Sequence, residues 1–212
     1  MFLSRVEINP QLNKTMWALA SPQRMHAIIA TSFPTALNAA SRVLWRLDRL
    51  AYAQYLIVQS AVRPDFSSLI EQLGWPKSGQ KWDTREYDAF LRALQPGQNW
   101  RFRLCANPVR SVKTLGERGR GKVLAYTSVD QQKDWLQSHA EGCGIALPHF
   151  DLVGRDMLKF QRKDATVTLG VAAFEGLLEV RDADALRAAM TAGIGRAKAY
   201  GCGLLTLARV GG

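Results

Sequence analysis

The sequence predicts an α+β fold of two tandem ferredoxin-like domains, each with the element order βαββαβ. Three observations support this class. The chain has 212 residues, enough for two small domains that each bury a core. Strand and helix patterns alternate along it, and the order restarts after the turn-forming residues "LQPGQ" at 94–98. We therefore expect an N-terminal domain over residues 1–95 and a C-terminal domain over residues 99–212, RRM-like in plan but without an obvious sequence repeat.

The first half contains one clear helix start and one ambiguous segment. Ser21 as N-cap and Pro22 in the first turn begin a helix that extends to Phe33. Residues 85–94 fit either a helix or a strand, and we favour a strand because it would close the βαββαβ unit. Hydrophobic spacing predicts the other elements, which are a strand at 2–8, a hairpin of strands at 42–48 and 54–62, and a short helix at 66–73.

The second half repeats this order with better capping signals. Ser128 and Gln131 form a capping box for a helix that extends to about Ala140. Asp182 caps a later helix that Gly193 ends. The strands of this half are predicted at 100–106, 145–153, 157–162, 166–181 (with a bend or turn at Gly176) and 204–210.

The charge balance points to a polyanionic partner. Lys and Arg number 28 against 18 Asp and Glu, a net charge of +10, and the pI is near 9.9. Nucleic acid is favoured over a membrane, and an unselective basic surface is the alternative. Residues 101–122 hold seven cations and one acid, Glu117. The candidate RNA-binding cations are Arg101, Arg103, Arg110 and Lys113, and a second cluster on a projecting hairpin of Arg155, Lys159, Arg162 and Lys163.

Cysteine usage and hydropathy indicate a cytoplasmic protein. Cys105, Cys143 and Cys202 are scattered and form no CxxC pair, which argues against a disulfide framework. The N-terminus carries charge at Arg5 and Glu7, unlike a secretory signal. The longest apolar stretch, "LGVAAF", is far too short to cross a bilayer, so no membrane association is expected.

The stretch "GIGRAKAYGCGLLTL" at 193–207 has the composition of an anion cradle. Unhindered backbone amides beside cations favour a phosphate, although one glycine at 193 alone would be a helix C-cap. The stretch lacks the third glycine of a dinucleotide fingerprint, and "GERGRGKV" lacks the Ser or Thr of a P-loop. We therefore expect no small-molecule cofactor. The candidate phosphate-binding residues are Gly193, Gly195, Arg196, Lys198, Gly201 and Gly203.

The histidines leave two interpretations open. His26 falls at the border of the apolar face of its predicted helix, where a histidine can be structural or can reach solvent and transfer protons. His139, Glu141, Cys143 and His149 partly match the H-x-E half of zinc deaminases, but the P-C-x-x-C half is missing. We expect no metal site, and stoichiometric zinc in the purified protein would favour the alternative.

An ordered set of motifs resembles one known family. "RVLWRLD", "PGQNWRFRLCANPVR", "AAFEGLLEV" and the terminal glycine stretch occur in the order found in CasE, the crRNA-processing endoribonuclease family of type I-E CRISPR systems. The resemblance implies two ferredoxin-like domains, metal-independent cleavage of a precursor CRISPR RNA stem-loop, and assembly with other Cascade subunits. It also implies that His26 takes part in acid–base catalysis, that residues 193–203 contact the RNA backbone, and that residues 155–163 enter the groove of the stem.

Two positions depart from the family pattern. Gln23 stands where some relatives have a tyrosine, and Cys105 stands where arginine is common. Since glutamine cannot transfer a proton at neutral pH, the second catalytic role is open, with Lys14, Arg24 and Lys198 as candidates. The expected reaction is attack by the RNA 2′-OH, which leaves a 2′,3′-cyclic phosphate and a 5′-OH. The alternative function is a non-catalytic RNA-binding module with the same fold.

Overall fold

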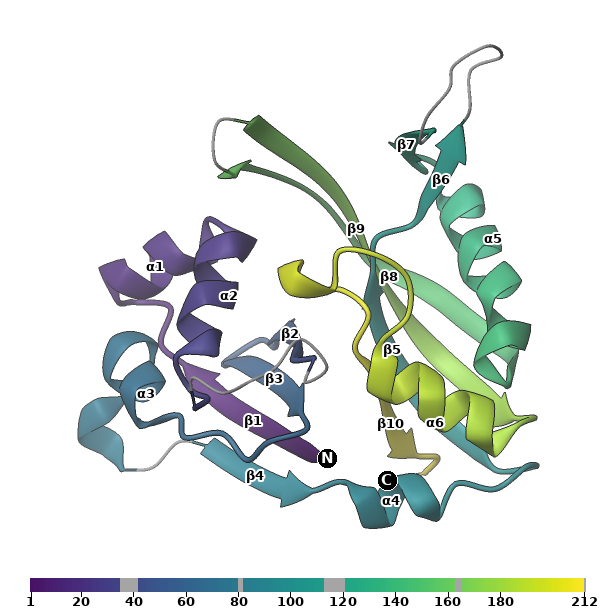
Figure 1. The fold of residues 1–212 in the computed structure, drawn as a ribbon, viewed down its shortest axis with the longest axis horizontal. Helices are drawn as coiled ribbons and strands as arrows, with labels where there is room; N and C mark the ends of the chain where they lie inside the picture. Colours follow the sequence, from purple (N-terminus) through teal and green to yellow (C-terminus); the bar gives the residue numbers. More distant parts are fainter. Residues whose placement is uncertain (35–41, 80–81, 113–120, 163–164, 212) are drawn as a thin grey trace.

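The computed structural model describes residues 1–34, 42–79, 82–112, 121–162 and 165–211. It contains two four-stranded antiparallel sheets, one from each half of the chain, with helices packed against both (Figure 1). The strand order places at the centre the first and third of each sheet's four strands, counted along the chain, as in a ferredoxin-like domain. The predicted fold class is therefore confirmed.

The first sheet has the order β2-β3-β1-β4. Ser4, Val6 and Ile8 alternate along β1 and are all buried, as the sequence pattern predicts. Met25 and Ile29 of the second helix cover this core. The elements are β1 (Phe2–Ile8), α1 (Asn13–Leu19), α2 (Pro22–Ala30), β2 (Leu44–Arg49), β3 (Gln54–Ser60), α3 (Ser67–Leu73), the 3-10 turn η1 (Pro76–Ser78), β4 (Trp82–Glu86) and α4 (Asp88–Arg92).

The prediction of a strand at 85–94 is wrong for most of its length. The strand β4 ends at Glu86, and the chain then forms α4. Tyr87, Leu91 and Leu94 have helical spacing, and all three pack into the core of the second half. The segment is therefore helical because this conformation buries the three side chains in the core of the second half. The sequence analysis also missed α1, a helix of 7 residues.

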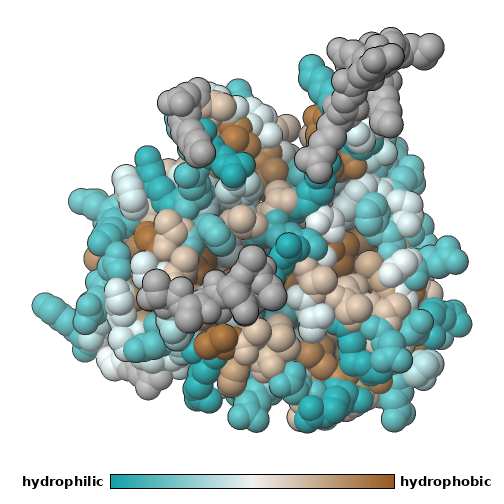
Figure 2. Space-filling view, viewed as in Figure 1, coloured by the Kyte–Doolittle hydropathy of each residue, from teal (hydrophilic) through white to brown (hydrophobic). Residues whose placement is uncertain are grey.

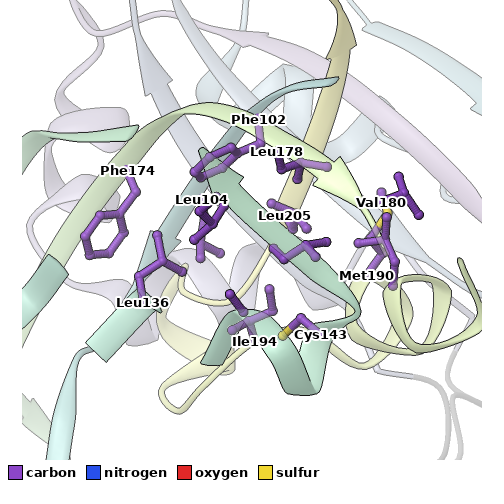
Figure 3. Close-up of a cluster of buried hydrophobic side chains, with 14 of the residues drawn as sticks. Phe102, Leu104, Leu136, Cys143, Phe174, Leu178, Val180, Met190, Ile194 and Leu205 are labelled. Atoms are coloured by element: carbon purple, nitrogen blue, oxygen red, sulfur yellow. The ribbon is translucent and has the colours of Figure 1, made fainter. Parts of the chain in front are cut away.

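The second sheet has the order β10-β5-β9-β8 and the same connectivity as the first. Its core combines strand residues such as Phe102, Phe174 and Leu178 with Leu136 and Met190 from two helices (Figure 3). The elements are β5 (Asn99–Ala106), β6 (Val109–Val112), β7 (Lys122–Ala125), α5 (Val129–Ala140), the 3-10 turn η2 (Glu141–Cys143), β8 (Ile145–Arg162), β9 (Ala165–Val180), α6 (Ala183–Ala192), the 3-10 turn η3 (Lys198–Tyr200) and β10 (Leu205–Arg209).

One long strand, β8, replaces the two short strands predicted at 145–153 and 157–162. The strand β8 is continuous over 18 residues and has two register shifts against β9. Gly176 does not form a turn, because it lies within β9 opposite Phe150. A Cβ at this position would lie 2.3 Å from the carbonyl oxygen of His149, so glycine allows a close strand approach near an irregular pairing.

The predicted helix caps of the second half are confirmed. The Ser128 hydroxyl accepts a hydrogen bond from the backbone N–H of Gln131 at 3.2 Å. The Asp182 carboxylate accepts from the backbone N–H groups of Asp184 and Ala185. Gly193 ends α6 with a φ of 78°. Among the residues described, no helix has the length and apolar composition required to span a bilayer.

A buried arginine joins the two sheets. Arg46 on β2 is 3% exposed and donates to the backbone oxygens of Arg103 and Leu204 at 3.0 and 3.2 Å. Its guanidinium also binds the Asp48 carboxylate at 2.7 and 2.9 Å. Removing one partner from such a network would leave a buried charge unpaired, which is strongly destabilising. The network therefore holds the two halves of the protein in one relative position.

Candidate active site

A cleft of about 600 Å³ brings His26 together with residues 195–199 of the glycine-rich stretch. The histidine comes from α2 of the first half, and Gly195 through Ala199 come from the connection between α6 and β10. Figure 1 shows this connection, in yellow, extending from α6 toward α2. The fold therefore brings two sequence-predicted features, far apart in the chain, to one cleft.

The His26 side chain has the protonation state that a general base requires. It is half-buried, and this burial lowers its pKa below the ordinary value of 6.5. The imidazole is therefore mostly neutral at pH 7. Its Nδ1 atom is buried and has no hydrogen-bond partner among the described residues. Because this atom is buried, proton exchange with a ligand in the cleft would have to use the other ring nitrogen, Nε2.

The charged side chains that line the cleft with His26 are cations. Arg42, Arg196 and Lys198 line it, and no carboxylate does among the residues described. Lys198 donates from Nζ to the carbonyl oxygen of Ala192 at 2.7 Å. Burial, with a smaller contribution from the Arg42 charge, lowers the pKa of Lys198 below its ordinary value. This lining suits a phosphate and disfavours a metal cation.

Arg42 is the residue of this cleft that the sequence analysis missed. It is the first residue of the strand predicted at 42–48 and lies just before β2, and no local pattern connects it with His26. The connection depends on tertiary packing of α2 and β2 against the segment around η3. Spacing in the sequence could not have found it.

The glycines of the stretch are required by packing as well as by backbone conformation. All four have positive φ, and an added Cβ at each would lie 2.8 to 2.9 Å from a neighbouring atom. The nearest groups are the side chains of Leu44, Trp135 and Trp45 and the Ile194 carbonyl oxygen, for Gly193, Gly195, Gly201 and Gly203 respectively. The predicted cradle is thus a closely packed turn that presents Arg196 and Lys198, with Gly195 at the cleft surface.

Lys14 and Arg24 do not join His26 in this cleft. Both are exposed, and neither lines the cleft. The Arg24 guanidinium lies 4.4 Å from the centre of the Trp17 ring and donates to the Trp17 carbonyl oxygen at 3.0 Å. Gln23 lies beside Arg24 in a separate depression that also includes Gln161 of β8.

The basic hairpin is exposed, as a groove-reading element would be. Arg155, Lys159 and Arg162 lie along β8, and the Arg155 guanidinium donates to the carbonyl oxygen of Thr127. The hairpin of β8 and β9 projects beyond the sheet in Figure 1. The described surface in Figure 2 mixes hydrophilic and hydrophobic side chains around it. The predicted residues Lys113 and Lys163 lie outside the described residues.

The remaining predicted cations have different surroundings. Arg101 and Arg110 are exposed on β5 and β6, and Arg110 lies over the Tyr126 ring at 5.8 Å. Arg103 is half-buried and paired with two carboxylates, since its guanidinium lies 3.1 Å from Asp48 and 2.6 Å from Glu175. These carboxylates neutralise Arg103, so it contributes less to phosphate binding than the exposed cations.

The zinc alternative gains no geometric support. Across the part of the chain that the structure describes, no group of three His, Cys, Asp or Glu side chains could hold a metal ion. His139 contacts the Trp135 carbonyl oxygen through Nδ1 at 2.7 Å, and Cys143 is buried in the core. These two residues therefore have structural partners.

Comparisons with known proteins agree over nearly the whole chain. The sequence profile of a family described as CRISPR associated protein matches residues 1–209. The CRISPR-associated endoribonuclease Cse3 of Thermus thermophilus is 32% identical over 226 residues, which cover 98% of this chain and 100% of the relative. The CRISPR system Cascade subunit CasE of Escherichia coli is 26% identical over 216 residues, covering 98% and 99%.

The structural comparison gives the same result. A structure of the CRISPR endoribonuclease Cse3 bound to 19-nucleotide RNA matches with a TM-score of 0.84 at 28% identity. The match covers 99% of this chain and 100% of that one. The similarity therefore includes both halves and the elements that form the cleft between α2 and the glycine-rich stretch.

Proposed function

Because the chain belongs to the CRISPR associated protein family, we propose that it is a metal-independent endoribonuclease that cuts the repeat stem-loop of precursor CRISPR RNA. One observation carries the proposal. The half-buried His26 imidazole lines a cleft whose other charged lining residues, among those described, are all cations. The relative Cse3 is an endoribonuclease, and its structure contains bound RNA.

The proposed reaction uses the nucleophile that RNA carries. Neutral His26 removes the proton from the 2′-OH, whose oxygen attacks the adjacent phosphorus in line with the departing 5′-oxygen. The cations Arg42 and Arg196 stabilise the charge of the pentacoordinate intermediate. Lys198, whose pKa is lowered, protonates the 5′-oxygen as the P–O bond breaks. The products are a 2′,3′-cyclic phosphate and a 5′-OH.

This assignment gives the second catalytic role to Lys198. Lys14 and Arg24 lie outside the cleft, so they are poorly positioned to reach the scissile phosphate. A lysine with a lowered pKa is a stronger acid than an ordinary lysine and therefore a better proton donor near neutral pH. We assign Lys14 and Arg24 no chemical step.

The basic hairpin is the proposed stem-binding element. Arg155, Lys159 and Arg162 would contact phosphates of the stem, while the segment from Gly193 to Gly203 would hold the backbone at the cut. We further propose that the product remains bound and that the protein assembles with other Cascade subunits in the cytoplasm. The Escherichia coli relative is itself described as a Cascade subunit.

The test uses end-labelled repeat RNA and mass analysis of the products. Cleavage should continue in excess EDTA, should yield a 2′,3′-cyclic phosphate, and should stop when the nucleotide before the cut carries a 2′-deoxy ribose. Cleavage of the deoxy substrate at the normal rate, or loss of cleavage in EDTA, would overturn the mechanism. Tight binding with no cyclic-phosphate product would establish the alternative, a non-catalytic RNA-binding module.

A further inference from the structure

A second groove, of about 380 Å³, lies between the first-half helices and the long hairpin. Its walls come from α1 and α2 on one side and from β8 and β9 on the other, and Tyr200 of η3 also lines it. Figure 1 shows η3 between α2 and this hairpin. The residues to which the proposed chemical steps are assigned do not line this groove.

The groove lies next to the catalytic cleft at two chain segments, although the two cavities share no lining residue among those described. Met25 lines the groove, and the next residue, His26, lines the cleft. Likewise, Lys198 lines the cleft and Tyr200 lines the groove. A nucleotide bound beside the scissile phosphate would therefore be able to reach the groove.

The chemistry of the groove differs from that of the cleft. Apolar side chains such as Met25 and Leu158 line it, and the half-buried Tyr200 adds an aromatic ring. The Tyr200 ring is held by edge contact with Phe160 at 4.9 Å between centroids. Arg49 and Arg155 lie among the lining residues, so cations are available for adjoining phosphates. An apolar and aromatic slot beside cations matches an unpaired base with its backbone.

We infer that this groove holds the base of one of the two nucleotides that flank the cut. The inference rests on the proposed function, since it places the cut at His26. Withdrawal of that base from the stack would turn its sugar and phosphate toward the cleft and help to orient the 2′-OH for in-line attack. The groove would thus contribute to site selection as well as to affinity.

The first test changes the RNA, so it does not depend on protein folding. Uncleavable stem-loops with a 2′-deoxy ribose before the cut are prepared with an abasic site at either flanking nucleotide, or in the distal loop as a control. We expect one flanking abasic site to weaken binding about tenfold, the size of one base-stacking interaction. Weakening of less than about twofold at both flanking positions would overturn the inference.

The second test fills the groove from the protein side. Ala173 on β9 lines the groove and is paired with Gly154, which has no side chain, so Ala173→Phe has room to place its ring in the slot. Exposed Ala208 on β10 lies outside the groove, and Ala208→Phe serves as the matched control.

Ala173→Phe should weaken binding of intact RNA about tenfold but leave binding of the sensitive abasic RNA unchanged, because both changes remove the same interaction. Equal weakening of both RNAs would contradict a base site.

The two proposals fail separately. If a flanking abasic site weakens binding but the protein cleaves no RNA, the groove assignment stands and the endoribonuclease proposal is refuted. If cleavage depends on His26 but neither flanking abasic site weakens binding, the endoribonuclease proposal stands and the groove assignment is refuted.

Discussion

The two halves of the molecule have the same strand connectivity but very different hairpins. When the four strands of each sheet are counted along the chain, the first and third lie at the centre and the fourth lies beside the first. The β2–β3 hairpin has strands of 6 and 7 residues, whereas β8 and β9 have 18 and 16. The shared topology therefore does not explain the long hairpin, whose exposed basic side chains indicate a surface for a partner.

The two halves of the molecule contribute different parts of the proposed function. The proposed chemistry depends on His26 of the first half, and the proposed RNA-backbone contacts depend on the glycine-rich connection and long hairpin of the second half. Neither half contains the complete cleft. The Arg46 network, which binds backbone oxygens of the second half, keeps the two contributions in register. We therefore expect catalysis at the junction of the two halves. Variants that lose function should fall into two classes, those defective in the chemical step and those defective in RNA binding.

The largest expected effect is a chemical defect without a binding defect. His26→Ala should reduce the single-turnover cleavage rate by about 10²–10⁴-fold, because it removes the base that activates the 2′-OH. The dissociation constant for uncleavable stem-loop RNA should change by less than a factor of about three. His149→Ala is the matched control, since that side chain is 75% exposed and lies outside the cleft. Normal cleavage by His26→Ala would place the chemistry elsewhere.

The next effect concerns the stability of the glycine-rich connection. Gly201→Ala should lower the free energy of unfolding by about 1–3 kcal/mol, because position 201 has a φ of +84° and its Cβ would lie 2.9 Å from the Trp45 ring. Gly97→Ala separates the two causes, since its φ is +85° but nothing lies within 4 Å. Its free energy of unfolding should fall by about 1 kcal/mol.

Gly142→Ala provides the baseline for this series. It has neither a positive φ nor a neighbour within 4 Å, and it should change stability by less than about 0.5 kcal/mol. Urea unfolding of the three variants measures their free energies of unfolding and so tests this order. Equal stability of the Gly201 and Gly142 variants would show that contact with Trp45 does not constrain the connection.

Local sequence patterns predicted those parts of the fold that local chemistry determines. Ser128 and Asp182 form the predicted caps, and alternation located β1 and β5 within one residue. Segment 85–94 was assigned incorrectly because its helix buries Tyr87 and Leu91 in the other half's core, a long-range contact that no local window contains.

The candidate site shows the same division. His26, Arg196 and Lys198 could be named from the sequence because a histidine on a predicted amphipathic helix and cations among glycines are local signals. Arg42 could not, since only tertiary packing brings it to the cleft. The reason for the glycines was also hidden, because their neighbours Leu44, Trp45 and Trp135 come from distant elements.

The opposite class of defect should come from the hairpin. Replacing Arg155 and Arg162 with Ala should weaken stem binding and flatten the slope of log Kd against log salt by about one unit for each phosphate that these side chains neutralise. Cleavage at saturating RNA should remain within about threefold of normal. Arg85 and Arg181 form the matched control pair, since both are exposed and each is paired with a nearby carboxylate. An unchanged slope would show that the hairpin cations face water in the complex.

The smallest effect is the pH dependence that His26 imposes. Burial lowers its pKa, so the acidic limb of kcat/KM should have its midpoint below pH 6.5. An acidic midpoint above 6.5 would contradict a base in this environment.

The same shift affects stability, with a defined sign. Because the folded pKa of His26 is depressed, the unfolded chain binds the proton more tightly. The free energy of unfolding should therefore fall as pH decreases from 6.5 toward the folded pKa. His26→Ala should remove this part of the pH dependence, whereas His149→Ala should retain it. Urea titrations of both variants at about pH 7.5 and 5.5, on either side of the ordinary histidine pKa, measure the difference. Identical pH dependence in the two would mean that His26 is equally solvated in the folded and unfolded states.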